Sequence, residues 1–157
     1  MKPRVYLETS VVSYLTAWRS RDLLVAAHQQ ITRAWWQKHR TEYDVFVSQI
    51  VVGEASEGDP IAAQERLEIL KDVPLLAVRP EAVEFAGVLV QGLPLPANAD
   101  TDALHIALAT IERVNYLLTW NCRHIANATL RKRLESLCRA QGFEAPVICT
   151  PEELLGD

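Results

Sequence analysis

Short apolar runs alternate with longer segments of helical spacing along the whole chain. The runs are short and bounded by polar or turn-forming residues, which is typical of buried strands. We expect strands over residues 2–7, 45–48, 75–78, 116–119 and 146–149. Between them, apolar residues recur every three or four positions, as in helices that bury one face. This spacing predicts helices over residues 10–18, 22–39, 49–56, 61–71, 80–92, 100–113 and 128–140.

Residues at the helix boundaries support this division. Asp59 and Pro60 predict a helix start, with Asp59 as the N-cap and Pro60 at the first helical position. The other predicted caps are Thr9 or Ser10, Asp100 or Thr101, and Thr150 before a short terminal helix. Strands that alternate with helices imply a central parallel sheet flanked by helices on both faces. We therefore predict a single α/β domain over residues 1–157.

Four polar side chains stand near the ends of the predicted strands. Glu8 and Asn121 directly follow strands, Glu54 follows a strand by about one helical turn, and Asp102 opens an apolar helix. Each alone could be a loop residue, a helix cap or a solvent-facing side chain. Ligands of open parallel sheets bind at the carboxyl ends of the strands, so the four together predict a site at that edge.

Clustered carboxylates have a definite electrostatic requirement. Two carboxylates about 4 Å apart repel by roughly 4 kcal/mol at an effective dielectric constant near 20. Such a pair takes up a proton or holds a cation. Oxygen ligands favour Mg²⁺ or Mn²⁺ over zinc. A site of this kind suits phosphodiester hydrolysis, because the metal lowers the pKa of the attacking water and neutralises the developing charge.

Short motifs surround these residues: VYLETS at 5–10, VGE at 52–54, TDALHIA at 101–107 and LTWN at 118–121. In this order they resemble the motifs of PIN-domain proteins, and most closely those of the VapC-like toxins of bacterial toxin–antitoxin pairs. The resemblance covers nearly the whole chain. It implies a single PIN-like domain and an Mg²⁺- or Mn²⁺-dependent endoribonuclease.

The resemblance also implies roles for individual residues. Glu8, Glu54 and Asp102 take the acidic positions that bind the metal, and Asn121 takes a fourth catalytic position. Hydroxyl residues often accompany these acids, and Asp100 either adds a carboxylate or caps its helix. Arg123 and His124 directly follow Asn121 and could contact RNA phosphates. The residues expected to support the site are Thr9, Ser10, Asp100 and Thr119.

Two positions depart from the family pattern and keep an alternative open. The first acidic position is usually Asp, whereas Glu8 is longer by one methylene group. The fourth is often a carboxylate, whereas Asn121 is neutral, which would weaken a second metal site more than the first. The alternative is a catalytically weak or inactive PIN-like module that binds RNA or protein. A phospho-acceptor or nucleotide-binding domain fits poorly, because no glycine-rich loop follows the first strand.

Histidine and tryptophan side chains on two predicted helices allow further expectations. We interpret His105, one turn beyond Asp102, as a partly buried structural histidine. Trp35 and Trp36 are adjacent and point about 100 degrees apart on a helix, so one of them should reach a surface or interface. The resemblance implies that the helix over residues 22–39 helps to bind a cognate antitoxin protein and that the protein forms a homodimer. A fully packed core helix is the alternative.

Composition narrows the function and the compartment. The 157-residue chain has a net charge of −4, which argues against a protein that coats nucleic acid nonspecifically. Its apolar stretches are too short to span a bilayer, so we expect no membrane association. Met1 to Arg4 lead directly into the first strand, leaving no room for a signal peptide, and we expect a cytoplasmic protein. Cys122, Cys138 and Cys149 form no zinc pattern and should be reduced thiols.

Overall fold

The predicted strands form one parallel sheet in the computed structural model, which describes residues 1–156. Within these residues the sheet has five strands in the order β3-β2-β1-β4-β5. Every adjacent pair is parallel. The strands are β1 (Arg4–Leu7), β2 (Asp44–Ser48), β3 (Leu75–Leu76), β4 (Tyr116–Leu118) and β5 (Val147–Cys149). Each predicted strand is present, and most are shorter by one or two residues.

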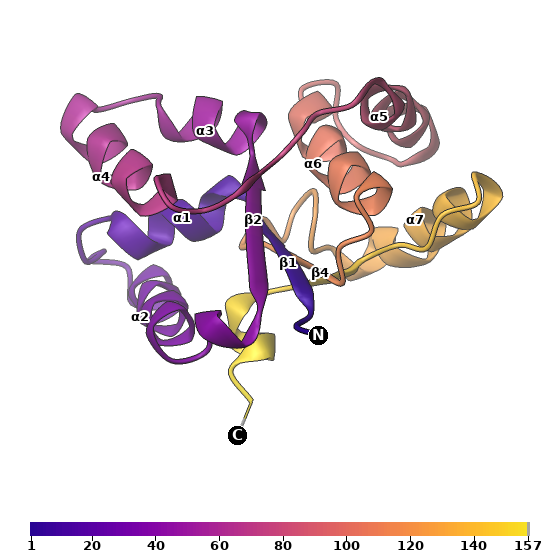
Figure 1. Ribbon diagram of the computed structural model, residues 1–157. Coiled ribbons are helices and arrows are strands. Elements are labelled where there is room, and N and C mark those ends of the chain that lie inside the picture. Colours follow the sequence, from indigo (N-terminus) through magenta and orange to yellow (C-terminus); the bar gives the residue numbers. More distant parts are fainter. Residues whose placement is uncertain (157) are drawn as a thin grey trace.

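Helices cover both faces of the sheet, as predicted. α1, α2, α3 and α4 lie on one side of the strands, and α5, α6 and α7 lie on the other (Figure 1). Short 3₁₀ helices, η1 and η2, follow α2 and β5. The helical elements are α1 (Thr9–Thr16), α2 (Leu23–Lys38), η1 (Arg40–Glu42), α3 (Gln49–Ala55), α4 (Pro60–Leu70), α5 (Pro80–Gly92), α6 (Asp100–Ile111), α7 (Ala128–Ala140) and η2 (Pro151–Leu154).

The start of α1 differs from the prediction in a way that concerns the site. The N-cap is Glu8, whose carboxylate accepts a hydrogen bond from the backbone N–H of Ser10. Thr9 and Ser10 therefore lie inside the helix, and the prediction that one of them is the cap was wrong. The helix begins as soon as β1 ends, so the strand-terminal carboxylate itself reaches the free N–H groups.

Other helix starts agree with the prediction only in part. Asp59 caps α4 as predicted, accepting from the Ala62 N–H at 2.9 Å. At α6 the N-cap is Ala99, which has no side chain able to cap, so neither Asp100 nor Thr101 has the predicted role. The terminal element η2 is a 3₁₀ helix whose N-cap, Thr150, makes no side-chain capping bond.

The buried centre of the molecule places the candidate residues at one edge. Val5, Tyr6 and Leu7 of β1 are completely buried between β2 and β4, so Glu8 emerges from the middle of the sheet. α6 is buried along most of its length, and His105 is fully buried rather than partly buried as predicted. Its buried position comes from packing, which helical spacing alone does not reveal.

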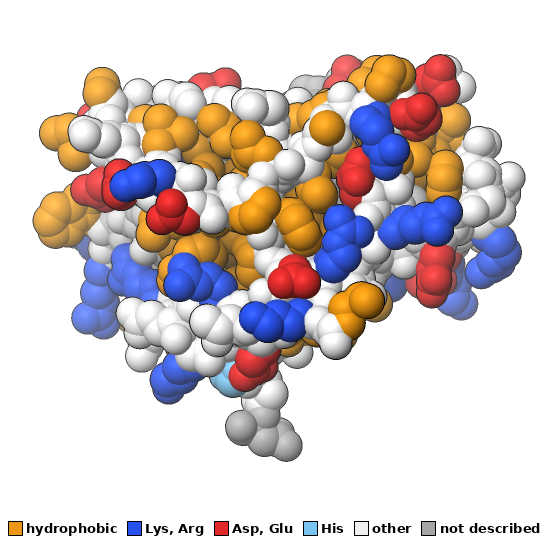
Figure 2. Space-filling view, viewed as in Figure 1, with side chains coloured by type: hydrophobic (Ala, Val, Ile, Leu, Met, Phe, Trp, Pro, Cys, Tyr) orange, Lys and Arg blue, Asp and Glu red, His pale blue; other side chains and the backbone are white. Residues whose placement is uncertain are grey.

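The two adjacent tryptophans differ in exposure, as the sequence predicts. Trp35 is fully buried, whereas Trp36 is partly exposed and stacks under the Arg40 guanidinium at 4.3 Å, so the two rings diverge as predicted. On the face shown in Figure 2, lysine and arginine side chains are scattered among acidic and apolar ones. Among residues 1–156, no helix has both the length and the apolarity needed to span a membrane.

Candidate metal centre

Glu8 is a buried carboxylate at the end of β1, and three hydrogen bonds hold it. Its Oε1 accepts from the hydroxyls of Ser10 and Thr119, both at 2.5 Å. Its Oε2 accepts from the Ser10 backbone N–H at 3.1 Å. Glu8 is only 6% exposed, so little water can reach its carboxylate. The three hydrogen-bond donors compensate for the hydration that burial removes.

The pairing of β1 with β4 brings Thr119 to Glu8. The Glu8 N–H donates to the carbonyl of Leu118, which extends the ladder past the end of β1. Two further bonds tie the residues after β4 to this group. The Trp120 N–H donates to Ser10 Oγ at 2.8 Å, and the Asn121 N–H donates to Thr119 Oγ1 at 2.9 Å. Ser10 and Thr119, which were expected to support the site in general, thus hydrogen-bond the Glu8 carboxylate.

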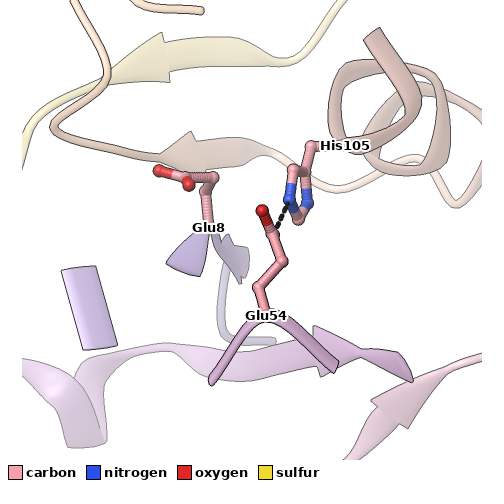
Figure 3. Close-up of side chains that lie close together, drawn as sticks. All are labelled: Glu8, Glu54 and His105. Atoms are coloured by element: carbon pink, nitrogen blue, oxygen red, sulfur yellow. Dashed lines mark hydrogen bonds and ion pairs between the residues drawn. The ribbon is translucent and has the colours of Figure 1, made fainter. Parts of the chain in front are cut away.

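Glu54 approaches from α3 and is held by a different pair of donors. Its Oε1 accepts from the Thr9 hydroxyl at 2.7 Å and lies 2.6 Å from Nε2 of His105. Figure 3 shows Glu54 and His105 pointing toward each other, with Glu8 beside them. Thr9 therefore supports Glu54, as Ser10 and Thr119 support Glu8.

The surroundings of Glu54 keep it ionised. Burial raises the pKa of Glu54, but hydrogen bonds from His105 and Thr9 and the charge of His105 outweigh burial, so the pKa is lowered overall. An ionised carboxylate only accepts hydrogen bonds. Nε2 of His105 must therefore carry the hydrogen that joins it to Glu54.

A buried polar chain continues behind His105. Its Nδ1 shares a 2.8 Å hydrogen bond with the Tyr6 hydroxyl, which in turn lies 2.8 Å from Ser48 Oγ. Burial is the main cause of a raised pKa for Tyr6, so its hydroxyl keeps its proton. Sequence reasoning missed the chain that links Ser48, Tyr6, His105 and Glu54. The i, i+3 spacing of Asp102 and His105 on one helix face was the available signal, but the partners lie on other elements.

Asp102 lies in the first turn of α6 and contacts residues that follow β4. Its Oδ1 accepts from Asn121 Nδ2 at 3.2 Å, and its Oδ2 lies 2.9 Å from Nδ1 of His124. Oδ1 of Asn121 accepts from the backbone N–H of His124 at 3.0 Å. The neutral amide of Asn121 therefore holds Asp102 in place. One ring nitrogen of His124 is already occupied.

The comparisons with known proteins rest on structure alone. No model of a known protein family matches the sequence, and no curated protein matches it. One similar structure is a chain of VapBC2 from Rickettsia felis, solved bound to a DNA fragment from the VapBC2 promoter. It is 16% identical in sequence to this chain, with a TM-score of 0.59. The match covers 93% of this chain and 97% of that one. Mycobacterium tuberculosis VapC20, a sarcin–ricin loop cleaving toxin, is 17% identical with a TM-score of 0.61, over 79% and 95% of the two chains.

The fold is that of a VapC-like PIN domain. At the carboxyl ends of its strands, potential ligand atoms of Glu8, Glu54 and His105 all lie within 4.8 Å of one another. Asp102 belongs to no such group among residues 1–156 and contacts Asn121 and His124 instead. The carboxyl edge of the sheet, which we call the PIN-like edge, therefore has two adjacent clusters. One contains Glu8, Glu54 and His105, and the other contains Asp102, Asn121 and His124.

The outer predicted residues differ in their exposure. Asp100 is an exposed residue at the start of α6, and Arg123 is exposed beside Asn121. His124 is half-buried against Asp102, so only part of its ring is available to a ligand.

The donor set of the PIN-like edge fits a hard cation. Oε2 of Glu8 accepts one hydrogen bond, and within residues 1–156 no hydrogen bond reaches Oε2 of Glu54, so both oxygens have lone pairs to offer. Oxygen donors of this type suit Mg²⁺ or Mn²⁺. Repulsion between the carboxylates does not by itself demand a cation, because Ser10, Thr119, Thr9 and His105 already hydrogen-bond them.

Proposed function

We propose that the protein is an Mg²⁺- or Mn²⁺-dependent endoribonuclease that hydrolyses RNA phosphodiester bonds in the cytoplasm. The observation that carries this proposal is the approach of Glu8 and Glu54 at the carboxyl edge of a PIN-like sheet. Ligand sites of open parallel sheets lie at this edge. The structural neighbour VapC20 is a toxin that cleaves the sarcin–ricin loop, which supports the choice of RNA.

Glu8 and Glu54 would hold the cation from one cluster, and Asp102 would reach it from the adjacent cluster, where it also contacts Asn121 and His124. When bound, the cation supplies charge neutralisation at the phosphate and a lowered pKa for the attacking water. Ser10 and Thr119 orient Glu8, and Thr9 orients Glu54. The remaining supporting contacts are the bonds of His105 to Glu54 and of Asn121 and His124 to Asp102.

The substrate would approach over the residues that follow β4. Arg123 is exposed, and its guanidinium can donate two parallel hydrogen bonds to a phosphate. His124 would contact RNA through Nε2, because its Nδ1 already bonds Asp102. We propose that these two residues orient the RNA backbone against the carboxylates.

Cleavage of RNA by the purified chain with Mn²⁺ tests the proposal. Asp102→Asn and Glu54→Gln should each abolish cleavage while leaving the far-ultraviolet circular dichroism spectrum unchanged. Glu57→Gln is the matched control, because Glu57 is exposed and hydrogen-bonds through its backbone rather than its carboxylate. Cleavage that persists in excess EDTA, or in both site variants, would contradict the proposal.

A catalytically weak or inactive module that binds RNA or protein is the second candidate. It is favoured by the neutral Asn121, whose amide is already engaged with Asp102, and by Glu8, whose carboxylate accepts three hydrogen bonds. Calorimetric titration with Mn²⁺ separates the two functions. Absence of Mn²⁺ binding together with intact RNA binding would favour the second candidate.

We further propose that the protein is the toxin of a toxin–antitoxin pair and forms a homodimer. The similar VapBC2 chain comes from a complex bound to promoter DNA, which supports a partner protein for this chain. Trp18 is 91% exposed in the segment before α2, and Leu23 and Leu24 are 86% and 67% exposed where α2 begins. A groove of about 660 Å³ runs along α2, and its lining includes the cations Arg19, Arg33 and Lys38. An antitoxin segment with apolar and acidic residues would complement this groove.

Two measurements test the partners. Light scattering of the purified chain should give the mass of a dimer. Leu23→Asp should abolish co-purification with the proposed antitoxin, because it places a charge in the apolar contact. Ile61→Asp is the control, since Ile61 is 69% exposed on α4, outside the groove lining. Equal co-purification of both variants would contradict the proposed surface.

A further inference from the structure

We infer that His105 is a positioning residue that aims one oxygen of Glu54 at the cation. The inference rests on the proposed function, because it concerns the same site. It starts from the bond of 2.6 Å between His105 Nε2 and Glu54 Oε1, which joins a fully buried imidazole to a partly exposed carboxylate. His105 lies on the protein side of Glu54 and not on the solvent side.

The hydrogen bonds to Glu54 distinguish its two oxygens. Oε1 accepts from both Thr9 and His105, and a carboxylate oxygen has two lone-pair sites. Oε1 is therefore saturated. Within residues 1–156, Oε2 receives no hydrogen bond, so both of its lone pairs remain for a cation. His105 and Thr9 together determine which oxygen binds.

The imidazole is held from behind by a second set of contacts. Its Nδ1 bonds the Tyr6 hydroxyl, and that hydroxyl bonds Ser48. Tyr6, Ser48 and His105 are all completely buried, and they come from β1, β2 and α6. Both ring nitrogens are therefore occupied, and rotation of the ring would break two hydrogen bonds in the core.

These contacts separate positioning from direct ligation. A ring nitrogen that carries a hydrogen has no lone pair to offer to a metal. Nε2 carries that hydrogen because it donates to Glu54, so ligation by His105 would require loss of the bond. Partners that orient a metal ligand in this way typically change metal affinity by 10–100-fold when they are removed.

Calorimetric titration of the full chain with Mn²⁺ tests the inference. His105→Phe removes the donor and should weaken Mn²⁺ binding by about tenfold or more. His105→Gln keeps an N–H donor of similar reach and should retain most of the wild-type affinity. His39→Phe is the control, because His39 pairs with Glu42 and contacts none of the site residues. Circular dichroism confirms that each variant is folded.

Each outcome bears on either the inference or the proposed function. If wild type and His105→Phe bind Mn²⁺ equally, the inference is overturned and the proposed function stands. If wild type binds no Mn²⁺, both are overturned. Electron spin-echo spectra that reveal nitrogen directly bound to Mn²⁺, or failure of His105→Gln to restore affinity, would overturn positioning in favour of ligation.

A second variant covers the case in which His105→Phe does not fold. Tyr6→Phe keeps the buried ring and removes only the hydroxyl that holds Nδ1. Mn²⁺ affinity should fall severalfold, because the imidazole loses its restraint while Glu54 and Thr9 are unchanged. Wild-type affinity in Tyr6→Phe would overturn the inference.

Discussion

The hydroxyl of Thr119 donates a 2.5 Å hydrogen bond to Oε1 of Glu8, although the two residues are 111 positions apart. Parallel pairing of β1 with β4 brings the two residues together, because the carboxyl ends of both strands lie at the same edge of the sheet. Thr119 is completely buried and Glu8 nearly so. The buried Glu8 carboxylate is therefore stabilised by a hydrogen-bond donor that follows a strand distant in sequence.

Thr119→Val should destabilise the protein by about 1–3 kcal/mol, the typical cost when a buried group loses its partner. Thr110→Val is the matched control. Thr110 is equally buried, but its hydroxyl donates to the Ile106 carbonyl within α6. Removal of the Thr110 hydroxyl therefore leaves no charged group without a hydrogen-bond donor. Urea unfolding measures both variants. Equal losses of stability would contradict a special role for Thr119.

Glu8→Asp should lower the affinity for Mn²⁺, even though Asp is the usual residue at this position in the PIN family that the sequence resembles. The shorter side chain would draw the carboxylate away from the hydroxyls of Ser10 and Thr119. Mn²⁺ affinity should fall by about tenfold or more, as when an orienting contact is lost. Calorimetry measures the change, with Glu57→Asp as the control. An increase in affinity would show that Glu8 is a poor fit to its surroundings.

Tyr6 should make stability fall at alkaline pH. Burial is the main cause that raises its pKa above the ordinary value of 10.0, and the charges of Glu8 and Glu54 add to it, against a lowering by Ser48. The folded protein keeps the proton while the unfolded chain loses it, so the contribution is full below about pH 10 and declines above it. Tyr6→Phe should show a shallower decline.

Thermal unfolding over a series of alkaline pH values measures this difference. Tyr14→Phe serves as a comparison, because Tyr14 is only partly buried. Ultraviolet absorbance should also show Tyr6 ionising only as the protein unfolds. Ionisation of all tyrosines in the folded protein would contradict the prediction.

The three cysteines should differ sharply in reactivity. Burial raises the pKa of Cys149 to about 12 and also raises the pKa of Cys138, whereas Cys122 is exposed. The thiolate is the reactive form, so iodoacetamide at mildly alkaline pH should modify Cys122 first. Peptide mass spectrometry identifies the modified residue. Early labelling of Cys149 would contradict the buried position.

Local sequence signals determined the elements. Asp59 and Pro60 mark the start of α4 because a side-chain oxygen and a ring with fixed φ act within one turn of helix. The apolar runs became the five parallel strands, and Glu8 and Glu54 approach each other near the ends of β1 and β2. The helix start and the extent of each apolar run depend on neighbouring positions along the chain, so a single sequence was enough to predict these elements.

Only the tertiary structure decided which polar groups meet. Glu8 caps α1, His105 holds Glu54, and Asp102 pairs with Asn121 and His124 instead of joining the other two acids. Each contact joins residues whose approach depends on strand order and on the depth at which a helix packs. Periodicity places a side chain on a face of its own element, but hydrogen-bond distances between elements follow from the packing of the whole core.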